Sequence, residues 1–125
     1  MSVVYVQNAE NYINFVTRRA AISLQVPNDL KTDWNIKTAR VPLTGAGRHR
    51  ENPVDYSINE HYLWHGTTPK GAVGITDKDF DLKRAGTAYG ALFGGGLYFA
   101  ESALKADEYT KQDHRGWYPM ILCRV

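Results

Sequence analysis

The sequence contains one cysteine, Cys123, which excludes an intrachain disulfide and a zinc site built on several thiolates. It also has no apolar run near the roughly 18 residues of a membrane helix, so no membrane partner is expected. The first ten residues lack a basic segment before an apolar stretch, so no secretory signal is expected. These absences predict an intracellular protein of the nucleus or cytoplasm, where thiols stay reduced.

The chain also lacks an excess of charge of one sign, since 15 Lys and Arg oppose 13 Asp and Glu for a net charge of +2. A balance this even argues against a nucleic-acid partner held by bulk electrostatics. The 125 residues, 43% hydrophobic and 22% charged, are those of one globular domain spanning 1–125.

Alternating β-type and helix-type patterns predict a mixed α+β fold. Asn8 and Thr68 are favourable N-caps, and Pro69 suits the first helical position. The expected strands cover 3–6, 61–65, 97–100 and 120–125, and the expected helices cover 9–22, a short segment after 68, and 101–109. Residues 28–57 carry loop signals and a basic stretch at 37–50, for which a solvated loop and a partner-binding patch both remain open.

Nine of the 11 glycines lie in the second half, a concentration that is typical of turns and of loops that approach a ligand closely. Gly96 is followed by Leu97 rather than lysine, and the glycine run opens a strand rather than a helix. Both phosphate-binding fingerprints therefore fail. His61 and His65 lack a third metal ligand, so no metal site is expected.

The remaining constellation joins His65-Gly66 at the end of one strand with Tyr98 at the end of another. Tyr109 follows 11 residues later, and Ala106 shares its helical face. Two aromatic rings, a glycine amide and an imidazole form a clamp for a flat cationic ring bearing a carboxamide. The alternative, core tyrosines and a structural histidine, stays open from the residues alone.

The segments LWHGT at 63–67 and FGGGLYFAES at 93–102, with Tyr109 beyond, resemble the poly(ADP-ribose) polymerase catalytic domain. This is the family of diphtheria-toxin-like ADP-ribosyltransferases. Tyr98 follows His65 by 33 residues, a separation compatible with that family. The opening segment 3–19 and the final MILCRV resemble the family as well.

The resemblance implies an NAD cleft between two packed antiparallel sheets, with NAD as co-substrate and no metal. ADP-ribose would pass from NAD to an acceptor, expected to be a protein, with release of nicotinamide. His65 and Tyr98 would be the catalytic residues, and the segment 81–93 would lie over the donor. The NAD-binding residues implied are His65, Gly66, Tyr98, Ala106 and Tyr109.

Two departures from the family pattern matter. Many members carry serine where this chain has Ala106, and the third motif residue lies on a strand beyond Val125. The chain is therefore expected to be the N-terminal portion of the domain, neither competent nor very stable alone. Polymer synthesis and single-unit transfer stay undecided, as does the oligomeric state.

An alternative function is a catalytically inactive module that binds NAD, ADP-ribose or a partner protein. An RNA 2′-phosphotransferase is disfavoured because its chemistry needs several arginines. The motif half has Arg84, Arg115 and Arg124.

Overall fold

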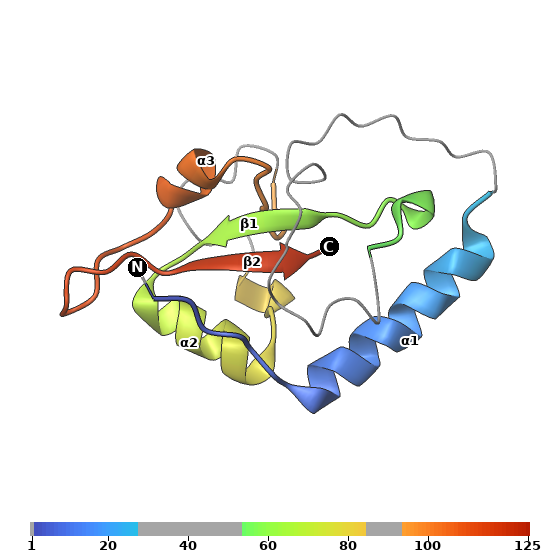
Figure 1. The fold of residues 1–125 in the computed structure, drawn as a ribbon, viewed down its shortest axis with the longest axis horizontal. Coiled ribbons are helices and arrows are strands. Elements are labelled where there is room, and N and C mark those ends of the chain that lie inside the picture. The colour runs from blue at the N-terminus through green and yellow to red at the C-terminus, as the bar shows by residue number, and fades with distance from the viewer. Residues whose placement is uncertain (1, 28–53, 85–93) are drawn as a thin grey trace.

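The computed structural model describes residues 2–27, 54–84 and 94–125, which form an α+β arrangement (Figure 1). The basic stretch at 37–50 lies outside the described residues. The elements in chain order are α1 (Ala9–Gln25), η3 (Tyr56–Ile58), β1 (Tyr62–Gly66), α2 (Pro69–Lys78), η4 (Leu82–Arg84), α3 (Ala103–Asp107) and β2 (Met120–Arg124), where η marks a 3₁₀ turn.

The centre of the described structure is the antiparallel pair β1 and β2, whose arrows run in opposite directions in Figure 1. Their register runs from Tyr62 opposite Arg124 to Gly66 opposite Met120. Two further hydrogen bonds, 2.8 and 2.9 Å long, join His61 to Val125. The strands expected at 61–65 and 120–125 are thus confirmed, and within the described ranges they make one two-stranded sheet.

The predicted helix starts are confirmed by their caps. Asn8 Oδ1 accepts a hydrogen bond from the amide of Asn11 at 3.1 Å, so α1 begins at Ala9. Thr68 Oγ1 accepts one from Gly71 at 3.1 Å, with Pro69 in the first turn of α2. Each cap satisfies an amide that the helix leaves unpaired. The third helix is shorter than expected and ends at Asp107.

Two expected strands are wrong. Residues 3–6 form no strand, and their side chains are exposed, Val3 by 83% and Val4 by 80%. In the segment 97–100 only Ala100 pairs, through an isolated bridge to Trp64. Strand propensity reflects packing on neighbouring strands, and no strand of the described part pairs with 3–6.

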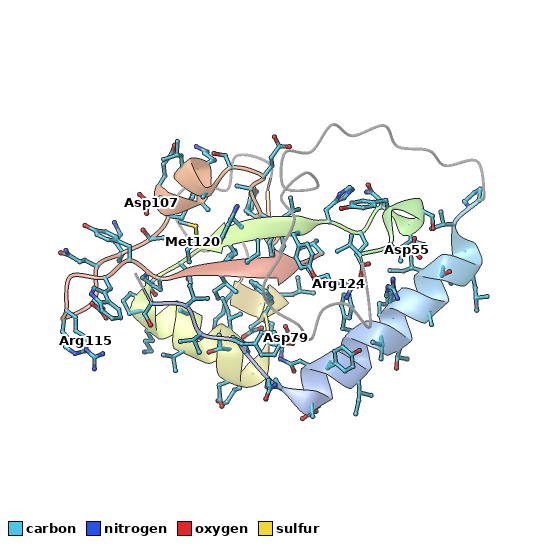
Figure 2. All side chains as sticks on the ribbon, viewed as in Figure 1. Asp55, Asp79, Asp107, Arg115, Met120 and Arg124 are labelled. Atoms are coloured by element: carbon cyan, nitrogen blue, oxygen red, sulfur yellow. The ribbon has the colours of Figure 1, made fainter. Side chains whose placement is uncertain are left out.

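A buried carboxylate ties α1 to the sheet. Glu60 is 4% exposed and accepts two hydrogen bonds of 2.8 Å from the Arg124 guanidinium. Arg19 of α1 approaches the same carboxylate at 3.3 Å, and the Asp55 amide donates to it at 2.6 Å. Figure 2 shows Asp55 and Arg124 at the end of the sheet next to α1. A buried carboxylate needs such partners to remain charged.

The other end of α1 is tied to α2, because the side-chain Nδ2 of Asn8 donates a hydrogen bond to the Asp77 carbonyl at 2.9 Å. The apolar core of the described residues is small and comprises Ala106 and Cys123, 3% and 9% exposed. Burial, together with the nearby charge of Asp79, raises the pKa of the Cys123 thiol to about 12. Cys123 is thus an unreactive core residue, as its place in an apolar strand predicts.

Candidate active site

Gly66 presents its backbone amide and carbonyl at the edge of β1 that faces away from β2. Hydrogen-bonded and non-hydrogen-bonded pairs alternate along an antiparallel ladder. Since His61 and Val125 exchange both bonds, Gly66 stands opposite Met120 as a non-hydrogen-bonded pair. No residue of the described ranges bonds to the Gly66 amide or carbonyl.

The segment before Ala100 runs along this free edge of β1. Trp64 and Ala100 exchange hydrogen bonds of 2.7 and 2.8 Å. Continuing that antiparallel register places Gly66 opposite Tyr98 as the next hydrogen-bonded pair. The ladder stops before this pair, and the Tyr98 carbonyl oxygen lies 2.9 Å from Nδ1 of the His65 ring.

This hydrogen bond fixes the tautomer of the neutral His65 ring. A carbonyl oxygen only accepts hydrogen bonds, so Nδ1 carries the proton and donates it. In the neutral imidazole, Nε2 is then an acceptor with its lone pair directed away from Tyr98. The site therefore offers one ring nitrogen that can accept a hydrogen bond from a ligand hydroxyl.

Gly66 is also the point where α3 touches the sheet. A Cβ added to Gly66 would lie 1.7 Å from the Ala106 carbonyl oxygen, so only glycine permits this approach. The same carbonyl accepts a hydrogen bond of 3.1 Å from the Tyr109 amide. The Ala106 backbone thus lies against Gly66, and the Tyr109 amide bonds to Ala106. Tyr98 joins this group through its bond to His65, the neighbour of Gly66.

The two tyrosines present partly exposed rings, with 36% of Tyr98 and 41% of Tyr109 accessible. The Tyr98 hydroxyl donates to the Gly94 carbonyl at 2.6 Å, which ties the ring to the glycine turn. The Lys105 ammonium lies 5.6 Å from the centre of the Tyr109 ring, and its bond to Glu108 raises the pKa of Lys105. The Tyr109 ring therefore already contacts one cation.

Two residues that the sequence did not single out contact His65. Phe80 meets its ring edge to face, with centroids 5.0 Å apart and planes at 88°. Phe99 lies 5.6 Å from the same ring. The available signal for Phe80 was its isolation as an apolar residue between Asp79 and Asp81. Of the loop expected at 81–93, residues 85–93 lie outside the described residues.

The arrangement suits a neutral carboxamide and a hydroxyl rather than a metal ion. A primary carboxamide has both a donor and an acceptor, which match the paired carbonyl and amide of Gly66. Among the described residues, no three His, Cys, Asp or Glu side chains gather as metal ligands. Nor does any helix in these ranges have the length and apolar character needed to cross a membrane.

Comparison with known proteins identifies this architecture. Residues 31–125 match the family described as the poly(ADP-ribose) polymerase catalytic domain, and the match covers more than half of the chain. The chain therefore belongs to this family of ADP-ribosyltransferases, whose members use NAD as substrate.

Individual relatives match parts of the chain. Protein mono-ADP-ribosyltransferase PARP11 of Mus musculus is 39% identical over 56 residues, which are 45% of this chain and 17% of that protein. Poly [ADP-ribose] polymerase 2 of Caenorhabditis elegans is 26% identical over 108 residues, or 84% of this chain and 20% of that protein. Protein mono-ADP-ribosyltransferase PARP12 of Mus musculus is 34% identical over 68 residues, 54% of this chain and 9% of that protein. The chain thus spans a fifth or less of the length of these relatives.

Proposed function

We propose that the protein transfers ADP-ribose from NAD to an acceptor, most simply a protein side chain, with release of nicotinamide. One observation carries the proposal: the His65 ring takes the Tyr98 carbonyl out of the ladder and leaves the Gly66 amide and carbonyl at an open strand edge. A glycine edge beside a fixed imidazole offers a carboxamide site and a hydroxyl site on adjacent residues.

Gly66 would hold the nicotinamide carboxamide through its amide donor and carbonyl acceptor. Tyr98 and Tyr109 would contact the ring, because aromatic faces attract a cationic pyridinium by about 0.5–2 kcal/mol. Ala106 lies against Gly66 and offers no hydroxyl, so the carboxamide would make one hydrogen bond fewer than with a serine there. One hydrogen bond contributes about 0.5–1.5 kcal/mol, so the alanine weakens the site without abolishing it.

His65 would act on the sugar. With Nδ1 donating to Tyr98, its Nε2 accepts a hydrogen bond from the adenine-side ribose. NAD supplies the ADP-ribosyl group and the nicotinamide leaving group. The residues of this chain would fix both ends of the donor, and such orientation lowers the entropic barrier to transfer. A nuclear or cytoplasmic location belongs to the same proposal.

The test is transfer of labelled ADP-ribose by the full-length protein and its variants His65→Ala and Tyr98→Ala. The loop between α3 and β2, with Arg115 at its tip in Figure 2, supplies matched controls. His114 and Tyr118 are exposed there, Tyr118 by 56%. We expect transfer to be lost in both site variants and kept in His114→Ala and Tyr118→Ala. Full transfer by both site variants would contradict the proposal.

Ala106 favours a second candidate, a module that binds NAD or ADP-ribose without turnover. The same variants separate the two functions when binding is measured by calorimetry beside transfer. Binding that depends on His65, with no NAD consumed by the wild-type full-length protein, would support the binding module. If the wild-type protein binds NAD and also releases nicotinamide from it, the two results together support the transferase.

A further inference from the structure

Three rings meet beside the candidate NAD site. His65 contacts Phe80 with centroids 5.0 Å apart and Phe99 at 5.6 Å. Phe80 and Phe99 also contact each other, at 5.3 Å and an interplanar angle of 67°. All three rings thus touch one another within the range of favourable aromatic contacts. Phe80 reaches this cluster from the far end of α2, fifteen positions after His65.

The backbone that delivers Phe80 is unusual. Asp79 ends α2 with φ 103° and ψ 175°, a region that residues with a side chain rarely adopt. Its amide donates to the Ile75 carbonyl at 2.9 Å, and its carboxylate accepts from the Phe80 amide at 2.7 Å. The chain therefore leaves the helix abruptly at Asp79. Such a conformation persists where surrounding contacts hold it, and the next residue, Phe80, contacts His65 and Phe99.

The His65 ring needs this support, because the described contacts give it a single hydrogen bond. Rotation about χ2 of histidine is broad and roughly two-fold, so one bond at Nδ1 does not by itself exclude a flipped ring. In a flipped ring, Nδ1 would leave the Tyr98 carbonyl and Nε2 would change direction. Phe80 packs against this imidazole at 88° with the ring centroids 5.0 Å apart, a contact that depends on how the imidazole is oriented.

We propose that Phe80 is a positioning residue of the NAD site: its ring, delivered by the strained turn at Asp79, holds the His65 imidazole in the single orientation that directs Nε2 to the donor. The part of the proposal that concerns NAD affinity rests on the proposed function. Its structural part, one orientation and one tautomer of His65, concerns the protein without donor. The two parts are therefore measured separately.

The first measurement is the side-chain ¹⁵N spectrum of histidine at alkaline pH, where imidazoles are neutral, assigned with His65→Gln. The wild-type chain is expected to show His65 as one Nδ1–H tautomer. Phe80→Leu is expected to show a mixture of tautomers, and Phe80→Tyr, which keeps the ring, to restore the single one. Phe15→Leu is the matched control, because Phe15 contacts Arg124 at 5.2 Å instead of His65.

The second measurement is NAD binding by calorimetry. Phe80→Leu is expected to weaken it about two- to tenfold, the effect of one misdirected hydrogen bond, while Phe15→Leu leaves it unchanged. Phe80→Met serves if Phe80→Leu does not fold, because methionine is a flexible side chain that fills irregular space without a ring. That variant should also show mixed tautomers.

A single Nδ1–H tautomer in Phe80→Leu, or in Phe80→Met where Phe80→Leu does not fold, would overturn the positioning role. Failure of the wild-type chain to bind NAD would contradict the proposed function, and the tautomer comparison would still decide the role of Phe80. Mixed tautomers with unchanged NAD affinity would overturn the link between ring orientation and donor binding.

Discussion

The imidazole of His65 replaces the backbone amide of Gly66 as the partner of the Tyr98 carbonyl. The register set by Trp64 and Ala100 would pair Gly66 with Tyr98, yet Nδ1 of His65 lies 2.9 Å from the Tyr98 oxygen. The His65 side chain thus bonds to the carbonyl that Gly66, the next residue, would bond to if the ladder were one pair longer. The Gly66 amide and carbonyl have no hydrogen-bond partner among the described residues, and the proposed function assigns them to the nicotinamide carboxamide.

We expect His65→Ala to close this edge. With the imidazole removed, the Tyr98 carbonyl is available to the Gly66 amide, and the ladder can extend by one pair. Hydrogen exchange of the Gly66 amide should therefore slow in His65→Ala relative to wild type, with no change at Leu63, which already pairs with Cys123. Equal or faster exchange at Gly66 would show that His65 does not hold the edge open.

Gly66 is expected to tolerate no side chain. In Gly66→Ala the new methyl group would lie 1.7 Å from the Ala106 carbonyl oxygen, so α3 must shift, at a cost of about 1–3 kcal/mol or more in unfolding free energy. Gly74→Ala is the matched control, because nothing lies within 4 Å of a Cβ there. An alanine inside α2 should stabilise the chain by about 0.5–1 kcal/mol. Urea unfolding measures both, and equal effects would contradict the close approach.

Local chemistry made the helix starts predictable. The caps at Asn8 and Thr68 act over three residues, and Pro69 suits a first turn in any context. Strands are harder, because pairing partners are distant in sequence. Residues 120–124 pair and residues 3–6 do not, although both are apolar and rich in β-formers. The sequence of residues 97–100 is typical of a strand, but the Tyr98 carbonyl is hydrogen-bonded to the His65 ring.

The candidate site also contains residues that the sequence predicts and one that it does not. His65, Gly66, Tyr98, Ala106 and Tyr109 were expected from motif resemblance, and their contacts around Gly66 are seen in the fold. Phe80 was not expected, because its contact with His65 depends on the backbone conformation of Asp79. That conformation arises from tertiary contacts, and an aspartate in the sequence gives no sign of it.

Ala106→Ser should strengthen donor binding. The residue is 3% exposed and its backbone touches Gly66, so a hydroxyl there would lie beside the proposed carboxamide position. One added hydrogen bond corresponds to about a two- to tenfold higher affinity for NAD or nicotinamide. Ala103→Ser is the control, because Ala103 belongs to the same helix and is exposed. Calorimetric affinities that rise equally in both variants would contradict a role for position 106.

The buried pair of Glu60 and Arg124 should respond strongly to loss of one partner. Arg124→Met leaves the Glu60 carboxylate, 4% exposed, without its two bonds of 2.8 Å. Arg19 stays 3.3 Å from this carboxylate, so the expected loss in unfolding free energy is that of hydrogen bonds to a charged group, about 1.5–3 kcal/mol, and adding Glu60→Gln should recover part of it. Lys105→Met breaks the exposed Lys105–Glu108 pair and should leave the melting temperature unchanged. Equal melting temperatures for Arg124→Met and Lys105→Met would contradict the account of the buried pair.

Cys123 should make the chain less stable in alkali. Burial raises the pKa of its thiol from 9.0 to about 12, so the native state binds the thiol proton more tightly than the unfolded state. Its contribution to stability is complete below pH 9.0 and is lost as the pH rises towards 12. Cys123→Ala removes this term, so the fall in melting temperature between pH of about 9 and about 11 should be shallower in the variant. In the native wild type at neutral pH, alkylation of the thiol should be slow and should accelerate in urea. Identical alkaline slopes for wild type and Cys123→Ala, or rapid alkylation without urea, would show that the thiol is accessible in the native state.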